Sequence, residues 1–156
     1  MTPISIANEA AVLALNNAHA RELSWLEVPA LRALVDQAFS VQVIGEGDAF
    51  LLALDHTATY DSPNFAWLKA RYSRFVYVDR VAVAARARGR GLARKLYEDL
   101  FARAKSAGHG LIVCEVNVLP PNPSSDAFHA ALGFTEVGRA AQPDRGRTVR
   151  YLARSL

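Results

Sequence analysis

Hydrophobic residues in the first 55 positions follow two periodicities. Apolar residues spaced three and four apart predict a helix over residues 5–19 and a second over about 28–39. Two short apolar runs, 41–44 and 49–54, then flank the turn sequence Gly45-Glu46-Gly47-Asp48. Glycine and aspartate between apolar runs are typical of a hairpin, so we expect two helices followed by two antiparallel strands.

The middle of the chain predicts a strand, a helix and a second strand. After a long polar and aromatic connection at 56–73, β-branched and aromatic residues predict a strand at 75–83. Leucines four residues apart predict a helix at 91–107, and the apolar run 111–117 predicts the next strand. Within the connection, residues 65–71 are compatible with one or two helical turns.

The C-terminal quarter begins with a proline-rich link at 120–123, which cannot continue a regular element. A short helix is expected at 125–132, followed by an antiparallel pair at 134–139 and 148–152 around the polar turn 142–146. No repeat or low-complexity tract interrupts this order. It predicts a mixed α+β fold with a central sheet.

Composition fits one domain over residues 1–156, because 51% apolar residues suffice to build a core in a chain of this length. The single cysteine, Cys114, lies in an apolar run, which excludes a disulfide framework and favours a reducing compartment. No run approaches the roughly 18 apolar residues of a membrane span. We therefore expect a soluble, cytoplasmic protein.

Charge is distributed unevenly between the two halves. Residues 1–73 carry 4 basic and 8 acidic side chains, whereas residues 74–156 carry 14 and 7. A basic half favours a polyanionic partner, either nucleic acid or a phosphorylated small molecule. The motifs must decide between them.

One segment between a predicted strand and a predicted helix meets three requirements of pyrophosphate binding; it reads Arg88-Gly89-Arg90-Gly91-Leu92-Ala93. The first helical turn leaves amide groups without intrahelical partners at the positive end of the helix dipole. Gly89 and Gly91 lack a Cβ and Ala93 is small, so phosphate oxygens can approach the backbone. Arg88 and Arg90 can add charge-assisted hydrogen bonds.

Other phosphate-binding loops do not fit, since the chain has neither a Gly-x-x-x-x-Gly-Lys-Ser/Thr string nor a complete Gly-x-Gly-x-x-Gly. Residues 83–96 instead resemble the signature segment of the GNAT superfamily of acetyl-CoA-dependent N-acetyltransferases. Its pattern Gln/Arg-x-x-Gly-x-Gly/Ala is matched by Arg88, Gly91 and Ala93. As in that family, the match lies where a strand leads into a helix.

A second segment, Asn122-x-x-Ser125-x-x-Phe128-His129 followed by Leu132-Gly133-Phe134, is similar to the family's Asn-x-x-Ala/Ser-x-x-Phe-Tyr and Leu-Gly-Phe. The resemblance covers roughly residues 74–139. It implies the GNAT fold, a mostly antiparallel central sheet flanked by helices. In that fold the strands around Val83 and at 111–117 splay apart to admit the pantetheine arm of coenzyme A.

The resemblance also implies which residues bind acetyl-CoA. The pyrophosphate contacts fall on residues 88–93. The backbone of Val81, Ala82 and Val83 is expected to pair with the pantetheine arm in the manner of an added strand. Asn122 and Ser125 are expected to face the same arm from the other side.

Amide formation needs a neutral amine and a protonated leaving thiol, so two proton-handling groups are expected. Asp79 falls where some family members carry a glutamate. If its strand is regular, Asp79 shares a face with Phe75, Tyr77, Val81 and Val83, where burial would raise its pKa. Glu115 on the neighbouring strand competes for the role of base, and deprotonation through water is a third option. An ion pair with an arginine is the alternative role for Asp79.

His129 stands where the family usually has the tyrosine that protonates the departing sulfur. Ser125 and His129 are one helical turn apart and can face the cofactor together. An imidazole with a pKa of about 6.5 can donate a proton, although it is mostly neutral at pH 7. A histidine that only lines the cofactor site is the other interpretation.

The sequence therefore predicts direct transfer of an acetyl group from acetyl-CoA to a primary amine of a small molecule or peptide, without a covalent enzyme intermediate. The alternative is a non-catalytic acyl-CoA-binding module or sensor of the same fold. Nucleic-acid binding lacks any recognition motif. We expect no nucleic acid, membrane or metal ion among the partners, and both a monomer and a homodimer stay open.

Overall fold

Both predicted N-terminal helices form, and the structure, a computed structural model describing residues 1–156, adds two short elements to them. The elements of this part are β1 (Thr2–Pro3), α1 (Ile6–Ala18), α2 (Ala20–Leu23), α3 (Val28–Asp36), β2 (Ser40–Ile44) and β3 (Ala49–Asp55). The Asn8 side chain accepts a hydrogen bond from the Ser5 amide at 2.8 Å and closes the start of α1. Gly45 and Gly47, both with positive φ, form the predicted turn between β2 and β3.

The long connection after β3 contains a nine-residue helix, α4 (Pro63–Arg71). The Ser62 side chain accepts a hydrogen bond from the Phe65 amide at 3.4 Å, and Pro63 takes the first helical position, where its missing amide is not needed. The predicted turns at 65–71 are thus two residues too short, because the Ser-Pro pair is the start signal.

The remaining elements follow the predicted order: β4 (Val76–Val83), α5 (Leu92–Ser106), β5 (Leu111–Leu119), α6 (Pro123–Ala131), β6 (Thr135–Gln142) and β7 (Arg147–Ser155), with short 3-10 turns η1 (Ala85–Ala87) and η2 (Pro143–Arg145). β6 and β7 are longer than predicted, because their pairing runs from Thr135 opposite Ala153 to Gln142 opposite Arg147. None of the helices has both the length and the hydropathy that crossing a bilayer requires.

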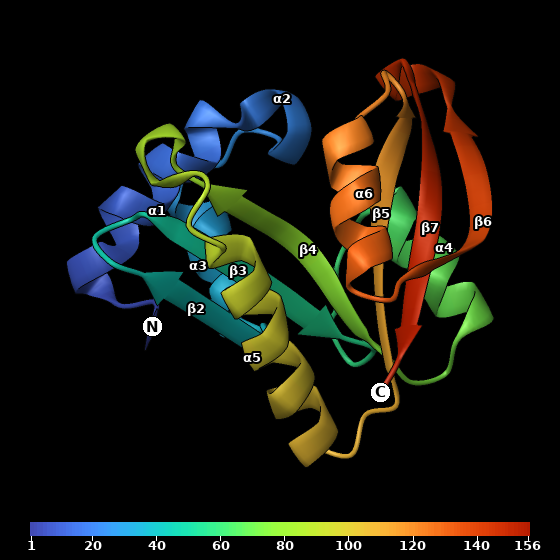
Figure 1. Cartoon of the computed structure of the whole chain (residues 1–156), viewed down its shortest axis with the longest axis horizontal. Coiled ribbons are helices and arrows are strands. Elements are labelled where there is room, and N and C mark those ends of the chain that lie inside the picture. The colour runs from blue at the N-terminus through green and yellow to red at the C-terminus, as the bar shows by residue number, and fades with distance from the viewer.

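The strands form one seven-stranded sheet in the order β1-β2-β3-β4-β5-β7-β6. Every neighbouring pair is antiparallel except β4 and β5. These two pair only at Val76–Ile112 and Tyr77–Val113, after which they diverge, as Figure 1 shows. The predicted fold, a mostly antiparallel sheet flanked by helices with two splayed strands, is confirmed.

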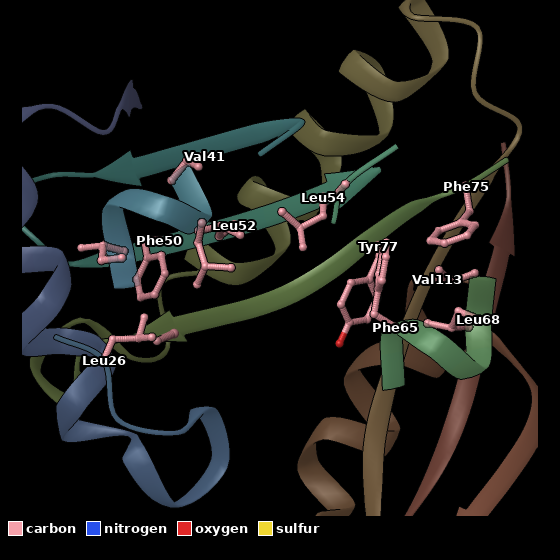
Figure 2. Close-up of a cluster of buried hydrophobic side chains, with 14 of the residues drawn as sticks. Leu26, Val41, Phe50, Leu52, Leu54, Phe65, Leu68, Phe75, Tyr77 and Val113 are labelled. Carbon is pink, nitrogen blue, oxygen red and sulfur yellow. The ribbon is translucent and has the colours of Figure 1, made fainter. Parts of the chain in front are cut away.

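Hydrophobic side chains pack on both faces of the sheet and hold β4 between two layers. On one face, α1, α3 and α4 cover a cluster that includes Phe50, Phe65 and Tyr77 (Figure 2). On the other face, Leu96 and Leu100 of α5 pack against β3, β4 and β5. Burial of apolar surface on both sides holds β4 in its position. The divergence of β4 from β5 is therefore part of the packed fold.

Asp79 lies in a β-bulge of β4, so the prediction that it shares a face with Tyr77 and Val81 is wrong. Pairing with β3 skips from Val78 to Arg80 and leaves Asp79 as the extra residue. Tyr77 therefore faces the cluster under α4, whereas Val81 packs on the α5 side. A period of two cannot be carried across a bulge, because the extra residue exchanges the faces of all positions beyond it.

Candidate active site

Four adjoining cavities form one continuous groove along the gap between β4 and β5. A cradle cavity of about 370 Å³ lies at the start of α5 and shares Val83 and Arg88 with an arm cavity of about 310 Å³. The arm cavity shares Val81 and His129 with a central cavity of about 220 Å³. The central cavity shares Glu115 with a polar cavity of about 260 Å³ on the far side. A long ligand and a second molecule can therefore meet in the middle.

The cradle cavity is lined by backbone that is free to bind an anion. Gly91 caps α5 with φ 69°, and Gly89 has φ 80°, both in the left-handed region that glycine tolerates. A Cβ at either glycine would meet no protein atom within 4 Å, so the space beside this backbone is open. The first intrahelical bond runs from the Lys95 amide to the Gly91 carbonyl, which leaves the preceding amides free. This arrangement fits a pyrophosphate.

The structure brings Arg88, but not the side chain of Arg90, into the cradle cavity. Arg88 lines the cavity and has no ion-pair partner. Arg90 is directed towards Asp48, with Nη2 3.4 Å from Oδ2, and does not line the cavity. Arg94 lines it but pairs with Glu98 at 2.9 Å. One arginine of the predicted pair is therefore available to an anion.

The arm cavity has one wall of strand edge and one wall of helix. Val81, Ala82 and Val83 border it from the part of β4 that β5 no longer pairs with. Asn122 and Ser125 border it from the start of α6, where the Asn122 side chain accepts a hydrogen bond from the Ser125 amide at 3.3 Å. An extended ligand can add to the free edge as a strand does. All five predicted contacts lie in this one place.

His129 and Tyr97 form a buried pair in the central cavity. The His129 side chain lies with Nδ1 2.8 Å from the Ser125 carbonyl oxygen and Nε2 2.8 Å from the Tyr97 hydroxyl. Because a carbonyl only accepts, Nδ1 carries the proton, and Tyr97 donates to Nε2. Burial lowers the pKa of His129 and raises the pKa of Tyr97 well above its ordinary value. The histidine is therefore neutral, and the hydroxyl beside it keeps its proton.

Glu115 is held in the middle of the groove by residues from four other elements. Its Oε1 accepts hydrogen bonds from Tyr77 Oη at 2.9 Å and Asn64 Nδ2 at 3.0 Å. Asn64 Oδ1 in turn accepts from Tyr151 Oη at 2.9 Å and Gln142 Nε2 at 2.7 Å. Oε2 is buried with no partner. Burial and then the charge of Asp79 raise the pKa of Glu115 to about 8, against the opposing effect of these hydrogen bonds.

Asp79 is engaged in a buried ion pair. Its Oδ2 lies 2.7 Å from Arg80 Nε, and both side chains are only 4% exposed. Arg80 also donates from Nη1 to Asn16 Oδ1 at 2.9 Å, which ties β4 to α1. Asp79 borders both the central and the polar cavity, yet its charge is already compensated. The geometry therefore favours Glu115 over Asp79 as the group that can accept a proton.

The sequence matches a protein-family model over the segment that forms most of this groove. The model described as Acetyltransferase (GNAT) family matches residues 58–134, which contain the cradle, the divergence of β4 and β5, and α6. The chain belongs to the GNAT family. Family membership makes it an acyltransferase, with acetyl-CoA as the co-substrate, as predicted.

Solved structures share the GNAT fold over the whole chain. Ribosomal-protein-alanine N-acetyltransferase from Brucella melitensis has a TM-score of 0.72 at 20% identity, with 99% of this chain and 98% of that chain covered. Ard1 from Thermoplasma volcanium has 0.75 at 14%, covering 99% and 95%. The protein yncA from Salmonella typhimurium, solved with its cofactor acetyl-CoA, has 0.71 at 20%, covering 99% and 92%. Among curated proteins, no sequence matches the chain significantly.

Three groups at the centre of this GNAT site carry little signal in the sequence. Tyr97 follows Leu96, one of the leucines spaced four apart in α5, and the sequence indicates only a core residue there. Asn64 sits in the connection that the sequence leaves mostly irregular, and Tyr77 is one of several strand aromatics. Their partners lie 32 to 51 residues away along the chain. Only a fold that fixes the register of β4 against β5 shows the contacts.

Proposed function

We propose that this GNAT chain, acting as one domain over residues 1–156, transfers an acetyl group from acetyl-CoA directly to a primary amine of a small molecule or peptide. The observation that carries the proposal is the position of Glu115. Its buried carboxyl, with a pKa of about 8, lines both the central and the polar cavity. A proton acceptor thus stands where a thioester in the groove would meet an amine from the far side.

Residues of the cradle and arm cavities hold the co-substrate in this proposal. When bound, acetyl-CoA supplies the activated acetyl thioester. The free amides of the first turn of α5 and the guanidinium of Arg88 bind the pyrophosphate. The backbone of Val81 and Val83 bonds to the arm, and Asn122 and Ser125 close the opposite wall. These contacts direct the thioester into the central cavity.

Glu115 takes the proton that the amine loses as the nitrogen–carbon bond forms. An ordinary glutamate has a pKa of about 4.3, far below the pKa of about 10.4 of a lysine-like amine, and is a weak base for it. A carboxyl with a pKa of about 8 is closer to the pKa of the amine and is therefore a better base. Oε2, which has no hydrogen-bond partner, is the oxygen available for the proton. Asp79, which is ion-paired with Arg80, contributes because its charge raises the pKa of Glu115. Asp79 is thus a positioning residue for the base.

Tyr97 supplies the proton that the sulfur takes when the carbon–sulfur bond breaks. Tyr97 lines the central cavity together with Glu115, and its high pKa keeps the proton on the hydroxyl oxygen until a thiolate forms. His129, hydrogen-bonded to that hydroxyl at 2.8 Å, holds it in place and is a positioning residue. After the products leave, solvent takes the proton from Glu115 and returns one to Tyr97. This assignment replaces the family's tyrosine on α6 with one on α5.

The polar cavity is the acceptor side of the site. It is lined by Arg145 and Arg147 and by Glu22 and Asp61, and none of the four takes part in an ion pair. Uncompensated charges of both signs favour an acceptor that carries an ammonium and a carboxylate close together, such as an amino acid or a short peptide.

We place the reaction in the cytoplasm. Cys114 is buried, and burial raises the pKa of its thiol, so it is an inert core residue and suits a reducing compartment. The proposed chemistry uses only residues that line the groove cavities of this chain, so it requires neither a monomer nor a homodimer.

A non-catalytic acyl-CoA sensor is the second candidate, and one observation favours it. His129 replaces the family's tyrosine on α6, and both of its ring nitrogens are already engaged. If Tyr97 does not substitute as the proton donor, the groove still binds acetyl-CoA, but no product forms.

Calorimetric titration with acetyl-CoA, combined with an assay of thiol release over a panel of amines and amino acids, separates the two candidates. The proposal predicts binding and turnover, with Tyr97→Phe lowering kcat at least about tenfold and leaving KM for acetyl-CoA unchanged. Tyr72→Phe, at a tyrosine outside the groove cavities, is the matched control and should keep full activity. Binding without thiol release for every acceptor would support the sensor.

A further inference from the structure

Asp55, His56 and His109 lie together at the end of the sheet opposite the groove. Asp55 ends β3, His56 follows it, and His109 lies between α5 and β5. One potential ligand atom from each residue lies within 4.8 Å of the other two. β4 and β5 are paired at this end of the sheet and diverge at the other, so this cluster is separate from the acetyl-transfer site.

Two imidazole nitrogens in the cluster have no hydrogen-bond partner. His56 Nδ1 and His109 Nδ1 are both buried, and residue His109 as a whole is only 7% exposed. A buried polar atom without a partner destabilises the fold, and a ligand bound to that atom removes the penalty. The two rings stand 5.7 Å apart at 70°, so one small ligand can reach both. The unprotonated nitrogen of an imidazole is the commonest metal ligand in proteins.

The third member of the cluster and its surroundings are arranged around these rings. Asp55 Oδ1 accepts hydrogen bonds from the Thr57 amide at 2.9 Å and the Thr57 hydroxyl at 2.5 Å, which orients the carboxylate and leaves Oδ2 free. Phe39 packs edge-on against His109 at 5.3 Å between ring centroids. Groups that fix the orientation of ligands in this way are a regular part of metal sites.

We propose that Asp55, His56 and His109 bind one divalent transition-metal ion, with zinc as the best fit. Two imidazoles and a carboxylate form a common zinc ligand set, with a fourth position open to water. Ligand atoms around a tetrahedral zinc ion lie roughly 3.4 Å from one another, so side-chain rotation must draw the cluster together slightly. The ion would tie the loop after β3 to the loop before β5. The sequence predicts no metal because the two histidines lie far apart along the chain.

The local charge is compatible with a cation. The His109 amide bonds to the Ala104 carbonyl at the C-terminal end of α5, where the helix dipole is negative. Arg74 is the basic side chain nearby, and its Nη2 donates to the Ala107 carbonyl at 3.2 Å, so its charge is partly compensated there. Asp55 supplies the formal negative charge.

The test is metal titration of the full chain without a histidine tag, with Zn²⁺ by calorimetry and Co²⁺ by visible absorption. We expect one equivalent of either ion and the absorption bands of a low-symmetry cobalt site. His56→Ala, His109→Phe and Asp55→Asn should each weaken binding at least about tenfold, since even outer-shell changes cost that much. His19→Ala, a histidine in the groove at the other end of the sheet, is the matched control and should bind as the parent does.

Thermal unfolding with and without zinc supplies a readout that does not depend on the acetyl-transfer site. Zinc should raise the unfolding temperature of the parent and of His19→Ala but not that of His56→Ala. Since His56 is only partly buried, this variant is expected to fold even if His109→Phe does not, and circular dichroism checks that it does. Absence of saturable binding would overturn the proposal. Equal affinity and stoichiometry in the parent and in His56→Ala would also overturn it.

Discussion

The cofactor end of the groove and its centre are built in different ways. The cradle cavity is made by a short continuous segment, residues 88–93, whose glycines and free amides act through the backbone. The Glu115 network draws its side chains from α4, β4, β5, β6 and β7. The cofactor end is thus a local property of the chain, whereas the centre of the site is a property of the whole fold.

This difference predicts that the cofactor end and the centre of the groove respond to different changes. Backbone amides at a helix start keep their direction as long as the helix forms, so the cradle tolerates many side-chain substitutions. The Glu115 carboxyl keeps its high pKa only while Tyr77, Asn64 and the covering elements exclude water. We therefore expect changes at the centre to alter chemistry and pH dependence, and changes at the cradle to alter affinity for acetyl-CoA.

The largest effect that we expect is on the pH dependence of the unfolding free energy, which tests whether Glu115 is buried. Folding raises the pKa of this carboxyl from 4.5 to about 8, so the folded state binds the proton more tightly than the unfolded state does. Stability of the parent must then fall as pH rises through this window. The glutamine in Glu115→Gln does not titrate. The unfolding free energy of this variant minus that of the parent should therefore increase by about 4 kcal/mol between pH 4.5 and 8.5.

Denaturant titrations at a series of pH values measure this difference. Glu136→Gln, at a glutamate on β6 whose pKa is lowered by its hydrogen bond to Arg139, is the matched control and should show no such growth. A constant difference between the parent and Glu115→Gln would mean that the carboxyl is solvated and the network is not as described.

Gly91→Val tests the local character of the cradle. With φ at 69°, valine is strained there, and its branched side chain would occupy the open space beside the free amides. Affinity for acetyl-CoA should fall on the order of a hundredfold, about the loss of two charge-assisted hydrogen bonds. Calorimetry measures it, and Gly146→Val is the control, at another glycine with positive φ, outside the groove cavities. Unchanged affinity in Gly91→Val would refute the cradle.

Gly138→Ala tests the support of the central network from β6. A Cβ at this glycine would overlap the Trp67 ring, which stacks on Tyr151 at 3.9 Å between centroids. Tyr151 donates to Asn64, so displacement of Trp67 should disturb the residues that hold Glu115. We expect a loss of about 1–3 kcal/mol in unfolding free energy from overpacking. Gly110→Ala, where a Cβ meets nothing within 4 Å, should cost less; equal costs would contradict the close contact.

The smallest expected effect separates two neighbouring arginines. Arg88→Ala removes the free guanidinium of the cradle cavity and should weaken acetyl-CoA binding about tenfold, as for one charge-assisted hydrogen bond. Arg90→Ala removes a side chain directed to Asp48 and should leave affinity nearly unchanged. Equal losses in the two variants would show that Arg90 turns towards the ligand.

The sequence predicts the cofactor end of the groove better than its centre. The order of helices and strands can be predicted from periodicity, and the splayed pair from the resemblance to the GNAT family. The same resemblance predicts that Arg88, Val81 and Asn122 lie along one groove, as they do. The bulge at Asp79 cannot be predicted, since it depends on pairing with β3 and exchanges the faces of the residues that follow.

The roles of the residues at the centre of the groove also cannot be predicted from the sequence. The sequence favours Asp79 over Glu115 as the base, and only packing shows that Asp79 is ion-paired and that Glu115 has a free buried oxygen. Likewise, His129 reads as a proton donor until Tyr97 is found beside it. Proton affinities in a site depend on burial and neighbours that tertiary structure alone defines.

The pH dependence of kcat/KM in the parent and in Glu115→Gln tests the central claim most directly. The ratio of the two values cancels the titration of the acceptor amine and leaves the titration of the base. We predict that the ratio rises about tenfold per pH unit below 8 and levels off above it, with acetyl-CoA affinity equal in both proteins. A ratio that stays constant from pH 6 to about pH 9 would show that Glu115 is not the base.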